Sequence, residues 1–122
     1  MRLDFQLLGT DVSPQEISRR TAIKPDTELE RGERNAALVL PRQNVWSLKS
    51  HVDSDEVSEH WADLESSLQE ARDEFREIAK TGTARLTLVL TRSERIPPLL
   101  IPPAMSEFAG FVNAVVEIDH LQ

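Results

Sequence analysis

The sequence contains no cysteine and no tyrosine, and only four of its 122 residues are glycine. Without cysteine the chain cannot form a disulfide bond, a thiolate zinc site or a thiol nucleophile. The glycines occur singly and cannot build a phosphate-binding loop; they are Gly9, Gly32, Gly82 and Gly110. These absences exclude cysteine chemistry and nucleotide binding by a glycine-rich loop.

Long apolar runs are missing as well. No stretch approaches the roughly 18 consecutive apolar residues that a membrane-spanning helix needs. The N-terminus, Met1 to Phe5, lacks the apolar core of a signal peptide. We therefore expect a soluble, cytoplasmic protein that has no membrane partner.

Basic residues are outnumbered, since 14 lysines and arginines stand against 21 aspartates and glutamates, giving a formal net charge of -7. Such a surface repels phosphate backbones, so we expect no nucleic-acid partner. It would suit a basic protein. The simpler interpretation is that the acidity only keeps the protein soluble.

The chain has the length of one domain, residues 1–122, and 39% of it is hydrophobic. Its first half predicts a strand over 3–8 and a helix over 14–21. Ser13 would cap this helix in a capping box with Glu16, and Ile17 would face the core. Residues Asp26 to Asn35 read as an exposed loop that is either functional or a tolerated insertion. Strands over 36–40 and 45–52 would flank a hairpin turn.

The middle of the chain predicts a long amphipathic helix over 54–81. Asp53 and Glu56 would form its capping box, and Gly82 would end it as a left-handed cap. Its apolar residues are spaced 4-3-4-3-4-3, which places them in one stripe along a helix. They are Val57, Trp61, Leu64, Leu68, Ala71, Phe75 and Ile78.

The last third predicts a strand over 84–91, an edge strand over 99–101 between prolines, a short helix through 105–112 and a final strand. In that final strand Ala114, Val116 and Ile118 would face inward. We expect an α+β fold: a mostly antiparallel sheet of about five strands, one long amphipathic helix across one face, and two short helices.

An ordered set of short motifs resembles domain-of-unknown-function family 4279. The motifs are Phe5-x-Leu7-x-Gly9, Pro14-x-Glu16-Ile17, Ile23-x-Pro25-Asp26, Gly32, Trp46-Ser47-Leu48 and Val116-Glu117-Ile118-Asp119. The resemblance covers nearly the whole chain and implies a bacterial stand-alone domain of this fold. It implies no agreed activity, so it supplies no catalytic, cofactor-binding or metal-binding residue.

The strongest surface feature is the acidity of the long helix, where only Arg72 and Arg76 oppose ten acids between Asp53 and Glu77. Six acids fall on the side away from the apolar stripe: Glu56, Glu59, Asp63, Glu70, Glu74 and Glu77. This side is either a solvated outer face or a docking surface for a basic protein.

Catalytic and metal sites have weak support. Glu56, His60 and Asp63 share one helix face and could hold a divalent metal, but an acidic helix with one histidine produces this spacing readily. His51 and His120 are isolated in the sequence. We expect no cofactor, no metal and no catalytic residue.

Two hypotheses about function remain. The first is a non-enzymatic protein-interaction module, of an immunity or regulatory type, that binds a basic partner through the acidic side of the helix. The alternative is a small-ligand-binding domain or minor hydrolase with a pocket between sheet and helix, lined by Trp46, Arg85 or Glu117. A homodimer formed through residues 99–101 or the Val89 face is also open.

Overall fold

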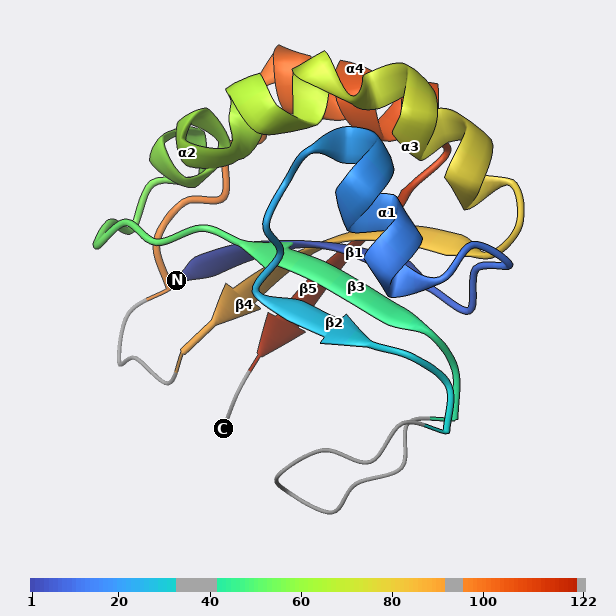
Figure 1. Cartoon of the computed structure of the whole chain (residues 1–122). Coiled ribbons are helices and arrows are strands. Elements are labelled where there is room, and N and C mark those ends of the chain that lie inside the picture. Colours follow the sequence, from blue (N-terminus) through green and yellow to red (C-terminus); the bar gives the residue numbers. More distant parts are fainter. Residues whose placement is uncertain (33–41, 92–95, 121–122) are drawn as a thin grey trace.

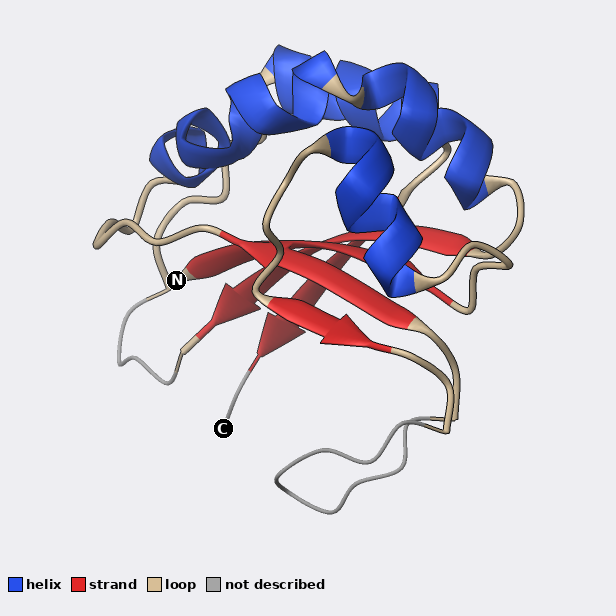
Figure 2. Cartoon of the chain, viewed as in Figure 1, coloured by secondary structure: helices blue, strands red, loops and turns tan. Residues whose placement is uncertain are grey.

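The computed structural model describes residues 1–32, 42–91 and 96–120, which form a five-stranded sheet with four helices on one side (Figures 1 and 2). The strands are β1 (Arg2–Leu8), β2 (Thr27–Leu29), β3 (Val45–Lys49), β4 (Thr83–Leu90) and β5 (Val115–His120). The helices are α1 (Pro14–Thr21), α2 (Val57–Glu70), α3 (Arg72–Ala79) and α4 (Pro103–Val112). None of these helices is long and apolar enough to cross a bilayer.

The strand order is β2-β3-β1-β4-β5, which places β1 at the centre. β1 pairs antiparallel with β3 and β4, and β2 pairs antiparallel with β3. β5 runs parallel to β4. The α+β class is therefore confirmed, but the prediction of a mostly antiparallel sheet is only partly right, because the parallel pairing of β5 makes the sheet mixed. The reason is that α4 lies between β4 and β5 in the chain, and a helical crossover returns the chain in its original direction.

The core lies between the helices and one face of the sheet. Leu3, Phe5 and Leu7 of β1 are fully buried there. The predicted helical stripe is buried against them, because all seven residues have exposed fractions of 8% or less: Val57, Trp61, Leu64, Leu68, Ala71, Phe75 and Ile78.

The predicted long helix is two consecutive helices, α2 and α3, that meet at Ala71 (φ -103°, ψ 14°). The expected capping box is wrong. Glu56 is the N-cap without a side-chain cap bond, and its backbone N–H donates to Ser54 Oγ at 3.0 Å. Gly82 does not have the predicted left-handed conformation, and Lys80 is the C-cap. Glycine is required at position 82 for a different reason. The backbone of Leu8 lies so close that a Cβ at this position would overlap its carbonyl oxygen.

Other boundaries differ where sequence signals were weakest. Thr27–Leu29 is a short strand inside the predicted loop, because it pairs with β3. Residues 99–101 form no strand. The predicted strand over 36–40, the turn beginning at 41 and the end of the predicted loop lie wholly or partly outside the described residues. Val116 and Ile118 were expected to be buried but are 46% and 45% exposed, because β5 is an edge strand.

Helix α1 has its predicted bounds and cap. Ser13 Oγ accepts a hydrogen bond from the Glu16 backbone N–H at 3.2 Å, and Ile17 is fully buried. The Glu16 carboxylate does not complete the capping box. It turns along the helix and accepts hydrogen bonds from Arg19 and Arg20.

We expect Gly82→Ala to destabilise the protein by about 1–3 kcal/mol, because the added methyl group overlaps backbone atoms of Leu8 to Thr10. Gly110→Ala is the matched control, since a Cβ there meets nothing within 4 Å and the site is helical. It should stabilise by about 0.5–1 kcal/mol. Urea denaturation measures both, and equal effects of the two substitutions would contradict the close approach.

Glu16 should make stability depend on pH. The hydrogen bond from Arg19 is the main cause that lowers the pKa of Glu16 from 4.5 to about 2. A carboxylate with a lowered pKa in the folded state stabilises the protein fully above its unfolded pKa and loses this effect as pH falls. The stability difference between the native chain and Glu16→Gln should therefore shrink between pH 5 and about pH 2. An NMR titration of Glu16 with a midpoint near 4.5 would contradict this account.

Candidate functional site

All six acids predicted for the outer side of the helix are exposed. We call this set the acidic face: Glu56, Glu59, Asp63, Glu70, Glu74 and Glu77. Within the described residues, its only ion pair joins Glu77 to Lys80 at 2.9 Å. Asp63 accepts a hydrogen bond from the His51 backbone N–H at 2.8 Å. The acidic face therefore keeps most of its charge uncompensated.

The two arginines of α3 turn away from the acidic face and onto α4. Arg72 Nη2 lies 2.6 Å from Glu107 Oε1, and this hydrogen bond raises the pKa of Arg72 and lowers that of Glu107. The Arg72 and Arg76 guanidinium carbons lie 3.9 and 4.9 Å from the ring centre of Phe111. Both guanidinium groups therefore contact α4. Although these arginines are close to the acidic face in the sequence, they do not neutralise its charge.

A groove of about 610 Å³ runs between the start of α2 and the proline-rich segment that precedes α4. Asp55, Glu56, Val57 and Ser58 form one wall. The other wall is mostly apolar and consists of Pro97, Pro98, Leu100, Ile101, Pro102 and Pro103. The sequence does not reveal this groove, because the prolines on both sides of 99–101 predict an edge strand there.

The groove joins the acidic face. Proline fixes its own backbone φ angle, so the four prolines reduce the conformational freedom of this wall. Leu100 is 77% exposed, which is unusual for a large apolar side chain on a fixed segment. Glu56 belongs to both the groove and the acidic face. The two features therefore form one continuous surface, with apolar contacts at one end and negative charge along the rest.

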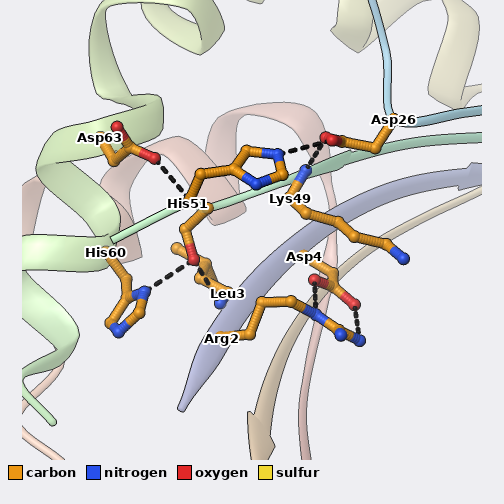
Figure 3. Close-up of polar contacts among 9 residues, drawn as sticks. Arg2, Leu3, Asp4, Asp26, Lys49, His51, His60 and Asp63 are labelled. Atoms are coloured by element: carbon orange, nitrogen blue, oxygen red, sulfur yellow. Dashed lines mark hydrogen bonds and ion pairs between the residues drawn. The ribbon is translucent and has the colours of Figure 1, made fainter. Parts of the chain in front are cut away.

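Beneath this surface, a buried polar chain joins β1 to α2 (Figure 3). The Leu3 backbone N–H donates to Ser50 Oγ at 2.9 Å, and Ser50 Oγ lies 2.7 Å from His60 Nδ1. His60 Nε2 lies 2.8 Å from the Ser54 carbonyl oxygen. Since a carbonyl can only accept, Nε2 carries the proton and Nδ1 accepts from the Ser50 hydroxyl.

A serine beside a histidine has the composition of a nucleophile and its base. Here His60 is fully buried and Ser50 is 5% exposed, so no substrate reaches either side chain. The arrangement satisfies buried polar groups and fixes the entry into α2. The prediction that His60 shares an exposed helix face with Glu56 and Asp63 is wrong. His60 lies three residues after Val57 and four before Leu64, so it continues the apolar stripe.

The same inward orientation removes His60 from a metal site with Glu56 and Asp63. Both of its ring nitrogens are engaged, while the two carboxylates are exposed. Among the described residues, no three histidine or acidic side chains are placed to hold one metal ion.

His51 is isolated in the sequence but not in the structure. Its Nε2 lies 2.6 Å from Asp26 Oδ1, and the other oxygen of Asp26 accepts from the Lys49 backbone N–H at 2.6 Å (Figure 3). Together with the bond from His51 to Asp63, these contacts fix the segment between β3 and α2. Asp26, at the start of the predicted loop, therefore has a structural role.

The predicted pocket residues do not come together. Trp46 is fully buried on the helix side of the sheet, where its Nε1 donates to Ser18 Oγ at 3.0 Å. Arg85 pairs in register with Gln6, which points to the opposite side from Phe5 and Leu7. Arg85 Nε and Glu117 Oε2 lie 3.7 Å apart on that opposite side. One pocket between sheet and helix cannot contain all three.

We expect Ser50→Ala to destabilise the protein by about 1–3 kcal/mol, because it leaves the Leu3 N–H and His60 Nδ1 buried without partners. Ser66→Ala, at an exposed position of α2, is the control and should change stability by less than about 0.5 kcal/mol. Thermal unfolding measures both. If Ser50→Ala were as stable as the native chain, the buried polar chain would not hold the start of α2.

Comparison with known proteins adds a family. No curated protein and no solved structure matches the chain. A family model described as a domain of unknown function (DUF4279) matches residues 1–122, the whole chain. The suspected resemblance is therefore confirmed, and the chain belongs to the DUF4279 family.

Proposed function

We propose that this chain is a non-enzymatic protein-interaction module, of an immunity or regulatory type, whose partner is a basic protein. The partner would insert an apolar side chain into the groove between α2 and the proline-rich segment. Its lysines and arginines would lie along the acidic face. The observation that carries this proposal is the continuity of the two features through Glu56.

Charge supports the proposal in two ways. The whole chain has a formal net charge of -7, which attracts a basic protein over long range. Locally, Arg72 and Arg76 contact α4 and not the acidic face. The partner's lysines and arginines would therefore not compete with these arginines for the acids. Complementary charge of this kind increases the association rate and selects against acidic partners.

The groove adds apolar contacts, which contribute binding affinity that the acids alone do not supply. Surface charge pairs contribute little affinity because water and salt screen them. A buried apolar anchor at the centre of an interface contributes more, and it is usually surrounded by polar residues. Leu100 and Ile101 beside Asp55 and Glu56 offer that combination.

A small-ligand site in the same groove is the second candidate. Its volume of about 610 Å³ falls within the usual range for ligand pockets. Ligand pockets usually have several polar groups that converge on the ligand, whereas the polar side chains of this groove lie along one wall. This difference favours the protein partner.

The test starts with affinity capture from the source organism, followed by titration of the purified captured protein. Glu59→Lys should weaken binding by roughly tenfold or more, because it places like charges in the interface. Leu100→Ser should also weaken it, whereas Ile96→Ser should not. Ile96 is a good control because it is 63% exposed but does not line the groove.

Asp11→Lys gives a charge control. It changes the net charge as Glu59→Lys does, but Asp11 belongs neither to the groove nor to the acidic face, and its backbone N–H donates to Thr81 Oγ1 beyond the end of α3. Screening at physiological salt should limit its effect to about twofold. The proposal is wrong if the captured protein is acidic, if its affinity does not fall with added salt, or if both lysine substitutions act equally.

A further inference from the structure

The large apolar side chains that stay exposed gather at two places in the described residues. Leu100 and Ile101 line the groove, with Ile96 just before it. The other place is β5, where Val115, Val116 and Ile118 are 53%, 46% and 45% exposed. Three such residues within six positions of one strand are more than scattered surface residues would give.

β5 is also an edge strand, and its protection consists of charge alone, from Glu117 and Asp119. The opposite edge, β2, has only three residues, and shortness is one way in which proteins protect an edge. β5 has six residues and contains no lysine, proline or glycine. Within the described chain, no strand pairs with its outer side. Its free backbone N–H and C=O groups could therefore pair with an added strand.

The two faces of β5 differ in chemistry. Val116 and Ile118 are in register with Leu86 and Leu88, which belong to the buried core on the helix side. Glu117 and Asp119 are in register with Thr87 and Val89, on the side away from the helices. A strand added to β5 would place alternate side chains beside apolar residues and beside acids.

A second copy of this chain fits this edge poorly. The two longest antiparallel registers that keep the faces of β5 matched both bring acids together. In a pair of β5 strands centred on Glu117, that residue would lie opposite its own copy. In a pair centred on Ile118, Glu117 would lie opposite the Asp119 of the second copy. Like charges directly opposite each other destabilise a sheet, and each copy has a net charge of -7. The occupant that fits both faces has basic residues in place of the acids.

We propose that the outer edge of β5 is a strand-addition site for an extended segment of another protein in which lysine or arginine alternates with apolar residues. The apolar side chains contact Val116 and Ile118, and the basic ones approach Glu117 and Asp119. The backbone hydrogen bonds continue the sheet beyond β5. The proposal does not depend on the groove, and its residues are not shared with the groove.

The probe is a synthetic eight-residue peptide of alternating lysine and valine with blocked ends, titrated into the ¹⁵N-labelled full chain. We expect saturable shifts and slowed hydrogen exchange for backbone amides within 115–120. Replacing every peptide lysine by glutamate should abolish binding. Methylating alternate backbone nitrogens should also abolish it, because this keeps the side chains but removes the donors on one peptide edge.

Substitutions in the chain locate the site. Glu117→Gln and Asp119→Asn together should weaken peptide binding roughly tenfold, because both charge pairs are lost. Leu100→Ser and Glu59→Lys should leave it unchanged, which separates this proposal from the groove. Three outcomes would overturn it: equal binding of the methylated peptide, shifts confined to α2 and α3, or a dimer of the chain alone that protects the β5 amides.

Discussion

The ring of Phe5, in the central strand, holds the two layers together. It contacts the rings of Trp46, Phe75 and Phe108 at 6.4, 5.0 and 5.6 Å between ring centres. These partners belong to β3, α3 and α4, so this one side chain contacts a neighbouring strand and two of the helices. Edge-to-face contacts of this kind add to the free energy from apolar burial. Because this cluster lies on one side of β1, the helices must cover that side.

Successive side chains of β1 point to opposite faces of the sheet, so the residues next to Phe5 lie on the face away from the helices. Asp4, adjacent to Phe5, points away from the helices and is only 3% exposed. Arg2 pairs with it through two hydrogen bonds of 2.7 and 3.0 Å, and this pairing raises the pKa of Arg2. A shielded carboxylate needs such a partner because its desolvation is otherwise costly. The central strand thus has an aromatic contact on one side and an ion pair on the other.

The surfaces proposed for binding lie where the core ends. The groove forms where the chain passes from β4 to α4 around the start of α2, and Leu100 in this segment stays outside the core. β5 leaves its apolar side chains exposed because no described element covers its outer edge. The acidic face keeps its charge because the nearby arginines contact α4. Each surface therefore depends on the position of α4 and the segments joined to it.

Local patterns in the sequence predicted local structure well. Ser13 and Pro14 predicted the start of α1, and the spacing from Val57 to Ile78 predicted the buried side of α2 and α3. The same spacing predicted which acids are exposed. The predictions failed where a residue's role depends on a partner distant in the chain. His60 takes part in a buried polar chain because Ser50 meets its ring, and Trp46 and Arg85 lie on opposite faces because of their strand registers.

The sequence by itself determined the class of the fold, the buried stripe and the acidity of one helix side, because hydrophobic periodicity and capping act within a few residues. Only the tertiary structure decided the direction of β5, the exposure of Val116 and Ile118, the groove, and the capture of Arg72 and Arg76 by α4. These features depend on which elements lie side by side. That choice depends on contacts between segments distant in the chain and not on any local pattern.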